Sequence, residues 1–181
     1  MAESTFTLNR YFDTMLTYSE LLEANEVYKT VIKNTNFTLP NIATLEFMLW
    51  AKREKLSFGP YQNLTFFEIS NRIHSDLVLL EAAQILFEKH DIKSIQLKMS
   101  NHSGYDLIVI DKDDIEIKGE AFNTAPSFFQ IKMRSELKKF KDNEVGIIAY
   151  NKSALSDKNT VFLKNKKVEY KKITFIECNK L

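Results

Sequence analysis

Hydrophobic and polar positions divide this chain into a first part with helical periodicity and a second part with strand periodicity. Apolar residues recur about every 3.6 positions over residues 8–33 and again over residues 39–55, which predicts two helices. Residues 57–60 contain glycine and proline and predict a break. A longer helix is expected over residues 65–90, because Thr65 and Glu68 have the spacing of a capping box and apolar residues continue along one side.

After this helix the period changes from 3.6 to 2, which is typical of strands. The expected strands cover residues 92–99, 105–110 and 115–122. Residues 101–104 form the first predicted turn, and residues 111–114 form a tight polar connection between the second and third strands. These three strands therefore predict an antiparallel meander.

The remaining third of the chain is expected to alternate helix and strand. A helix is predicted over residues 126–141, with Pro126 in its first turn and Ser127 or Thr124 as its cap. A buried strand follows over residues 145–150. Two further strands are expected in the tail, over residues 161–163 and 168–177, joined by a basic turn at residues 164–167.

The order from residue 65 to residue 150 is helix, strand, strand, strand, helix, strand, which predicts an α/β (α+β) fold with a mixed central sheet flanked by helices. Because no segment resembles a linker, the whole chain is expected to be a single domain over residues 1–181. Its expected parts are a helical N-terminal region (1–64), a core (65–150) and a C-terminal β extension (151–181).

Charge is distributed unevenly along the chain. Residues 1–120 hold 12 Lys and Arg against 18 Asp and Glu, whereas residues 121–181 hold 13 against 6. A basic C-terminal third could face phosphate, while acids in the middle could hold a divalent cation. No apolar run is long enough for a membrane span, the first residues do not resemble a secretory signal, and the single cysteine fits a reducing compartment, so we expect a cytoplasmic protein that does not contact membranes.

The candidate chemistry lies between Gly104 and Lys118. Asp106 lies inside the predicted apolar strand over residues 105–110, where a carboxylate is costly unless it has a partner or a cation. Strand geometry places Glu116, Lys118 and Glu120 on one face. If the two strands pair through the connection at 111–114, Asp106 can approach Glu116 and Lys118, so that two carboxylates and an ammonium group converge.

This grouping suits hydrolysis of a phosphodiester bond. Carboxylate oxygens of Asp106 and Glu116 are hard ligands of the kind that magnesium prefers. A bound magnesium ion neutralises phosphate charge and lowers the pKa of a water. Lys118 could orient the attacking water or stabilise the charged transition state.

The spacing of Asp106 and Glu116-Ile117-Lys118 resembles the motif of the PD-(D/E)xK nuclease superfamily, and the element order over residues 65–150 is similar to its restriction-endonuclease-like core. Tyr105 stands where the family name has proline. The resemblance implies that Asp106 and Glu116 bind one or two Mg²⁺ ions and that Lys118 is the catalytic lysine. It also implies an acid from the preceding helix, for which Glu81 is the first choice and Asp76 the second.

The resemblance extends to type II restriction endonucleases and implies a magnesium-dependent enzyme that cuts double-stranded DNA as a homodimer. Glu120 is a candidate for a second metal or for positioning water, and Gln130 is a further secondary candidate. The candidates for contact with the DNA backbone lie on the predicted helix over 126–141; they are Lys132, Arg134, Lys138 and Lys139. The alternatives are a DNA repair or recombination nuclease of the same fold, and a non-catalytic module that binds nucleic acid or protein.

Overall fold

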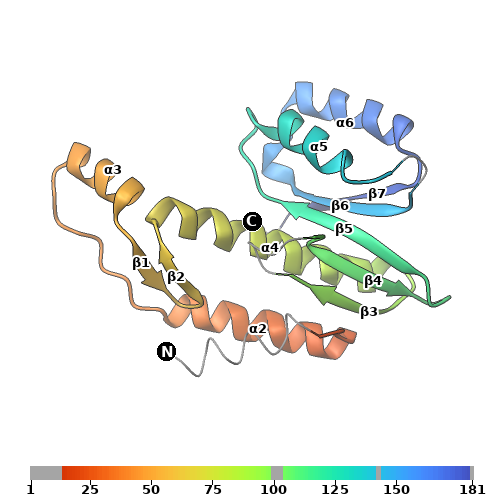
Figure 1. Ribbon diagram of the computed structural model, residues 1–181, viewed down its shortest axis with the longest axis horizontal. Helices are drawn as coiled ribbons and strands as arrows, with labels where there is room; N and C mark the ends of the chain where they lie inside the picture. Colours follow the sequence, from red (N-terminus) through yellow and green to blue (C-terminus); the bar gives the residue numbers. More distant parts are fainter. Residues whose placement is uncertain (1–13, 99–103, 142–143, 180–181) are drawn as a thin grey trace.

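The computed structural model describes residues 14–98, 104–141 and 144–179. The longest of the described helices, α4 (Phe66–Lys89), runs through the middle of the molecule (Figure 1). Thr65 caps it: the Thr65 hydroxyl accepts the Glu68 N–H at 3.3 Å, and the Glu68 carboxylate accepts the Thr65 N–H at 2.7 Å. The predicted capping box and the predicted helix over residues 65–90 are therefore confirmed.

Five strands form one mixed sheet in the order β3-β4-β5-β6-β7. Their bounds are β3 Ile92–Leu97, β4 Leu107–Asp111, β5 Glu116–Phe122, β6 Gly146–Asn151 and β7 Ile173–Cys178. The pairs β3–β4 and β4–β5 are antiparallel, whereas β5–β6 and β6–β7 are parallel. The predicted meander and helical crossover into a fourth strand are confirmed; residue 99 and residues 101–103 of the first predicted turn lie outside the described residues.

A tight turn fixes the register of β4 against β5. The Asp111 N–H donates to the Ile115 carbonyl at 3.1 Å, and the Asp111 side chain accepts the N–H groups of Asp113 and Ile115 at 2.9 and 2.8 Å. Asp114 takes a left-handed φ of 63°, which aspartate tolerates better than most residues. The register that follows pairs Ile110 with Glu116, Ile108 with Lys118, and Leu107 with Gly119.

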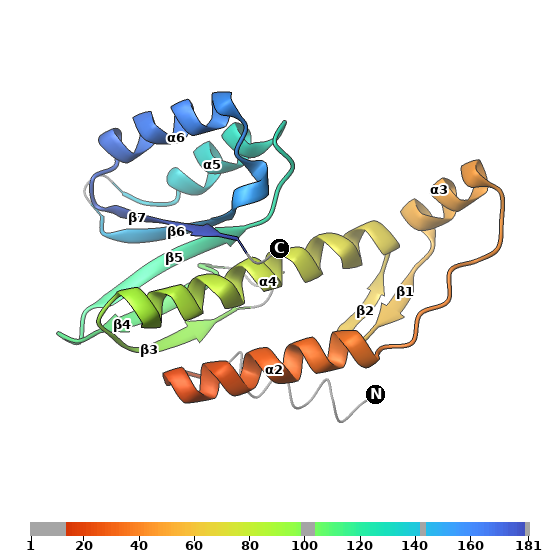
Figure 2. The same cartoon turned by 180° about the vertical axis from the view of Figure 1, so that it is seen from behind.

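Helices cover both faces of the sheet (Figure 2). On one face α4 packs over the strands, with α2 (Tyr18–Asn34) beside it; on the other lie α5 (Phe129–Leu137) and α6 (Asp157–Glu169). Residues of β6 alternate between the two cores, since Ile147 belongs to the cluster with α4 and Ile148 to the cluster with α5 and α6. All six residues of β6 are buried, as expected of a central strand with both faces covered.

The N-terminal region contains two described helices and a hairpin. α2 and α3 (Thr44–Arg53) confirm the two predicted helices in part; residues 8–13 of the first prediction lie outside the described residues. The predicted break at 57–60 is the turn of a hairpin between β1 (Leu56–Phe58) and β2 (Tyr61–Leu64), where Gly59 has a φ of 54°. The region is therefore not purely helical, because a short hairpin links α3 to α4.

The predicted C-terminal β extension is wrong in one respect. Residues expected to form a strand at 161–163, a basic turn at 164–167 and the start of the next strand all lie in α6, and only β7 is a strand. The β-branched residues Val161 and Val168 favoured a strand in the prediction. In the structure their side chains are 62% and 66% exposed and do not pack into the sheet. Only Asn159 and Leu163 of α6 are buried, which leaves little helical periodicity to read.

The start of α5 also differs from the prediction. α5 begins at Phe129 and its N-cap, Phe128, makes no side-chain capping hydrogen bond, so neither Ser127 nor Thr124 caps it. The turn is instead closed by the backbone, with the Phe128 N–H donating to the Ala125 carbonyl at 3.0 Å.

Among the described residues, no helix combines the length and the apolar character that crossing a bilayer requires.

Candidate functional site

A cleft of about 600 Å³ opens at the edge of the sheet where β3 and β5 end and β4 begins. α4 lines it from one side and α5 from the other, and the strand ends form its floor. The charged side chains that line it are those of Asp76, Lys98, Asp106, Glu120, Lys132 and Lys139. Acidic and basic groups from α4, β5, the α5 segment and the adjoining ends of β3 and β4 therefore face one space.

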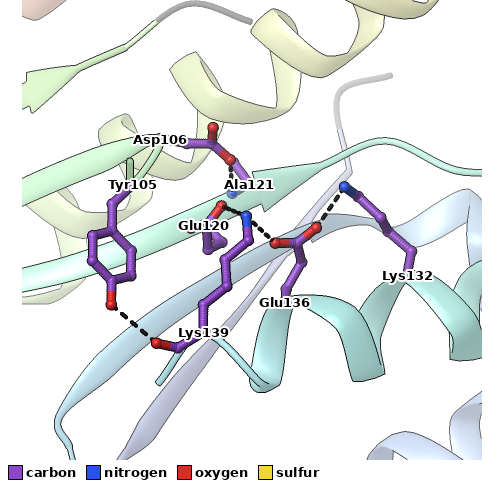
Figure 3. Close-up of polar contacts among 7 residues, drawn as sticks. All are labelled: Tyr105, Asp106, Glu120, Ala121, Lys132, Glu136 and Lys139. Carbon is purple, nitrogen blue, oxygen red and sulfur yellow. Dashed lines mark hydrogen bonds and ion pairs between the residues drawn. The ribbon is translucent and has the colours of Figure 1, made fainter. Parts of the chain in front are cut away.

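Asp106 and Glu120 stand side by side in this cleft. Leu107 pairs with Gly119, so one further step along the antiparallel register puts Asp106 opposite Glu120 on the same face of the sheet. One Asp106 carboxylate oxygen, Oδ2, accepts the Ala121 N–H at 2.9 Å, which anchors the side chain against β5 (Figure 3). Two carboxylates are thus held together by backbone pairing.

Glu120 is almost fully buried, with 1% of its surface exposed. Its Oε2 accepts a hydrogen bond from Lys139 Nζ at 2.8 Å, whereas its Oε1 has no hydrogen-bond partner among the described residues. Burial raises the pKa of Glu120 to about 8, and the charge of Asp106 adds to the rise although Lys139 opposes it. A buried carboxylate oxygen without a partner is costly, and a bound cation would relieve that cost.

Lys139 lies inside a chain of alternating charges that runs from Glu120 to Lys132 (Figure 3). Its ammonium group is 2.8 Å from Glu120 and 2.5 Å from Glu136, and Glu136 is also 2.5 Å from Lys132. Burial alone would lower the pKa of Lys139, but the two glutamates outweigh it and raise that pKa. Burial likewise opposes the ionised form of Glu136, yet the two lysines lower its pKa. Glu136 and Lys139 therefore stabilise each other's charged forms.

Asp76 reaches the cleft from α4 and is 1% exposed. The Tyr61 hydroxyl donates to its Oδ2, and the Tyr28 and Tyr61 hydroxyls are 2.6 Å apart. Because Tyr61 uses its proton on Asp76, the Tyr28 hydroxyl is the donor in the second bond. Burial raises the pKa of both tyrosines, and the Asp76 charge raises them further. This buried chain connects α2 and the hairpin to one wall of the cleft.

Tyr61→Phe is expected to lower the free energy of unfolding by about 1–3 kcal/mol, because it removes a donor from buried Asp76 and the acceptor of Tyr28. Urea unfolding monitored by circular dichroism measures this change. The matched control is Tyr150→Phe: the Tyr150 hydroxyl is buried and has no hydrogen-bond partner among the described residues, so its loss should be neutral or stabilising. Equal losses in both variants would contradict the proposed importance of the tyrosine chain.

The structure does not bring Glu116 to Asp106. Glu116 is exposed and pairs with Ile110, which lies four residues from Asp106 along β4. At about 3.4 Å per residue, this separation is roughly 13 Å. Lys118 is closer, since its partner Ile108 is two residues from Asp106, but its ammonium group lies over the Tyr105 ring at 5.4 Å from the centroid. The three residues of the predicted motif therefore share a face without meeting at one point.

Glu81, the first choice for a helical acid, lies elsewhere on α4. It is 7% exposed, and its Oε1 accepts the N–H of Asn179, beyond the end of β7, at 2.8 Å. Glu81 is not among the residues that line the cleft, whereas Asp76, the second choice, is. The five residues that separate them turn the helix by more than a full turn, so the two acids point to different neighbours.

The residues predicted on α5 and just after it divide into two groups. Lys132 and Lys139 line the cleft. The Gln130 amide donates to Asn159 of α6 at 3.2 Å, and Arg134 donates to Gln130 at 3.3 Å while lying 4.7 Å from the Phe162 ring centroid. Gln130 and Arg134 therefore face α6, and Lys138 is exposed to solvent.

Glu136 is the site residue that sequence reasoning missed. It is 2% exposed, although charged residues on a basic helix are usually solvated. Two signals were present in the sequence. Glu136 lies among Met133, Leu137 and Phe140 on the apolar side of the helix. Lys132 precedes it by four positions and Lys139 follows it by three, so both lysines lie on the same side of a helix as Glu136.

The donor set is compatible with magnesium. Asp106 and Glu120 supply hard oxygen ligands, and Glu120 Oε1, which accepts no hydrogen bond from the residues that the structure describes, is available to a cation. Over the described part of the chain, no group of three or more His, Cys, Asp and Glu side chains is close enough to hold a metal ion. Magnesium commonly binds through one or two carboxylates and keeps several waters, so a two-carboxylate site suits this ion better than zinc.

Comparison with protein-family models, with curated proteins and with solved structures found no match to this chain.

Proposed function

We propose that this protein is a magnesium-dependent nuclease that hydrolyses phosphodiester bonds of DNA, with Asp106, Glu120 and Lys139 at its centre. The observation that carries the proposal is the pair of adjacent carboxylates at a sheet edge, one of them with a buried, partnerless oxygen and an ammonium group 2.8 Å away. Burial and the neighbouring Asp106 carboxylate raise the pKa of Glu120 although Lys139 stands beside it, and a metal ion bound to both carboxylates would stabilise their charged forms.

The residues of the centre divide the work. Asp106 and Glu120 would hold Mg²⁺, which supplies charge neutralisation and a more acidic water. Lys139 reaches the same point from the segment after α5 and can stabilise negative charge on a phosphate or orient the attacking water. Lys132 lines the same cleft and can contact the nucleic-acid backbone.

The mixed sheet with helices on both faces supports a restriction-endonuclease-like core, and Asp106 keeps the motif position given to it by resemblance. The second acid and the lysine of the motif are supplied differently. The acid opposite Asp106 is Glu120 and not Glu116, and Phe122 stands where an E-x-K pattern starting at Glu120 would have lysine. Lys139 supplies the missing ammonium group from a different element.

Purified protein is expected to cut plasmid DNA when Mg²⁺ is present, to lose that activity in EDTA and to regain it when Mg²⁺ is restored, because two carboxylates alone cannot neutralise the phosphate. Gel electrophoresis of the products measures this. Discrete fragments would support a type II restriction endonuclease, whereas nicks without a fixed pattern would support a repair or recombination nuclease. DNA binding without cleavage under any divalent ion would instead identify a non-catalytic binding module and refute the proposal.

A homodimer is part of this proposal, because cutting both strands at a symmetric site requires two centres. α3 projects to one side of the molecule with the hairpin (Figure 1). It also carries exposed apolar side chains. Leu45, Met48 and Leu49 are 73%, 50% and 42% exposed. Burying this face against the α3 of a second copy would remove these side chains from water.

An enzyme of this kind would act in the cytoplasm, where the buried free thiol of Cys178 is stable.

Leu45→Glu is expected to convert a dimer into a monomer, because it places a charge at the centre of the proposed contact. Size-exclusion chromatography with light scattering measures the mass of parent and variant. Val161→Glu is the matched control, since Val161 is 62% exposed on α6, away from α3. A parent protein that is monomeric at all concentrations tested would rule out this dimer.

A further inference from the structure

One buried carboxylate holds two lysines of the cleft. Glu136 is 2% exposed, and its two oxygens each lie 2.5 Å from an ammonium group, Oε1 from Lys132 and Oε2 from Lys139 (Figure 3). Both lysine side chains remain nearly half exposed, at 47% and 43%. Glu136 therefore fixes the positions of two cations without removing either from the cleft.

The two lysines are held in different ways. Lys139 is shared between Glu136 and Glu120, whereas Lys132 is paired with Glu136. An ammonium group has three donors, so an ion pair with one carboxylate oxygen leaves capacity for a further acceptor. Because its side chain is nearly half exposed and lines the cleft, the Lys132 ammonium group can donate a further hydrogen bond to a ligand.

We propose that Lys132 and Lys139 form a paired phosphate-binding site, held in place by Glu136, which takes two neighbouring phosphates of one nucleic-acid strand. This inference rests on the proposed nuclease function, since it concerns the same cleft. The two ammonium groups each lie 2.5 Å from a different oxygen of the same carboxylate, so they stand close enough together to contact neighbouring phosphates of one strand. Lys139 takes the phosphate beside Asp106 and Glu120, and Lys132 takes the next one.

Glu136 is a positioning residue in this arrangement, because it acts through the two lysines. Its charge also opposes the polyanion, so it improves geometry at the expense of attraction. Removing the charge should therefore separate two effects that a merely structural residue would change together: DNA affinity should rise while the rate of cleavage falls.

The first test measures affinity for a short fluorescent DNA duplex by anisotropy, in EDTA and over a range of salt concentrations. Lys132→Gln is expected to weaken binding and to make the dependence of log affinity on log salt less steep by about 1, as for the loss of one phosphate contact. The matched control is Lys112→Gln, because Lys112 lies at the β4–β5 turn, at the far end of β4 from the cleft, and pairs with Asp91 at 3.4 Å. Equal changes in the two variants would overturn the proposal.

The second test compares Glu136→Gln and Glu136→Asp with the parent protein. Glu136→Gln is expected to bind the duplex more tightly in EDTA and to reduce kcat by about tenfold or more, as for a lost positioning contact. Glu136→Asp keeps the charge and should restore part of kcat together with the parent's affinity. A variant Glu136→Gln that binds and cuts as the parent does, or that loses affinity and kcat together, would overturn the role of Glu136.

The two tests separate this inference from the nuclease proposal. Binding in EDTA requires no catalysis, so the salt dependence of Lys132→Gln reports on the phosphate site even if no divalent ion supports cleavage. In that case the nuclease proposal fails while the phosphate site stands. If the parent cuts DNA and Lys132→Gln has the salt dependence of the parent, the phosphate site fails while the nuclease proposal stands.

Discussion

Glu120→Gln is expected to lower the rate of magnesium-dependent DNA cleavage by about 10³-fold, whereas Glu116→Gln should stay within about twofold of the parent. Glu120 is buried beside Asp106 and has a partnerless oxygen, so it is placed to share a cation. Glu116 is exposed and pairs with Ile110, roughly 13 Å from Asp106 along the strand. The two substitutions are chemically identical, and the difference between them tests position alone.

Single-turnover cleavage at saturating protein measures this prediction, and calorimetric titration of Mg²⁺ gives an independent readout. Glu120→Gln should bind Mg²⁺ more weakly, because a neutral amide replaces a charged ligand. The opposite ranking, with Glu116→Gln inactive and Glu120→Gln active, would restore the simple motif reading and refute the centre described above.

Glu120 should also make the stability of the metal-free protein depend on pH. Burial raises its pKa from 4.5 to about 8 in the folded state, so between these values the native protein binds a proton that the unfolded chain has lost. The free energy of unfolding in EDTA is therefore expected to fall as the pH rises from about 4.5 to about 8. Urea unfolding across this range should show a smaller fall in Glu120→Gln. The same fall in both proteins would contradict the pKa assignment.

Lys139→Met is expected to reduce cleavage by about 10²-fold or more, because it removes the ammonium group that stands 2.8 Å from Glu120. Lys139→Arg should not restore full activity, since a planar guanidinium does not replace a compact ammonium group between two carboxylates. Lys118→Met is the matched control. Lys118 lies over the Tyr105 ring at 5.4 Å from its centroid, and we expect only a small loss.

Stability must be separated from catalysis in this variant. Without Lys139, Glu120 and Glu136 lose a cation that both contact, which destabilises the fold by up to about 3 kcal/mol at neutral pH. The half-exposed position of Lys139 reduces that cost because water screens the pair. Cleavage should therefore be measured well below the unfolding temperature of each variant. A folded Lys139→Met that cuts at the parent rate would exclude Lys139 from the centre.

Much of this cleft could be predicted from the sequence, but not which glutamate stands opposite Asp106. The turn at 111–114 was predicted, and a hairpin closed between Asp111 and Ile115 pairs each step back along β4 with one step forward along β5. Counting from the turn therefore leads from Asp106 to Glu120. The E-x-K pattern instead favoured Glu116 as the second metal ligand and left Glu120 as a secondary candidate. Shared strand face is a necessary condition for contact, but register decides which residues meet.

By itself, the sequence determined the local features: the capping box at Thr65, the change of period after residue 90, the β4–β5 turn and the order of elements in the core. These depend on interactions between residues a few positions apart. Only the tertiary structure decided two others. It brought Lys139 to Glu120, and it made residues 157–169 a helix in spite of their exposed valines. Each of these depends on how α5 and α6 pack against the sheet, and no local pattern records which side chains that packing buries together.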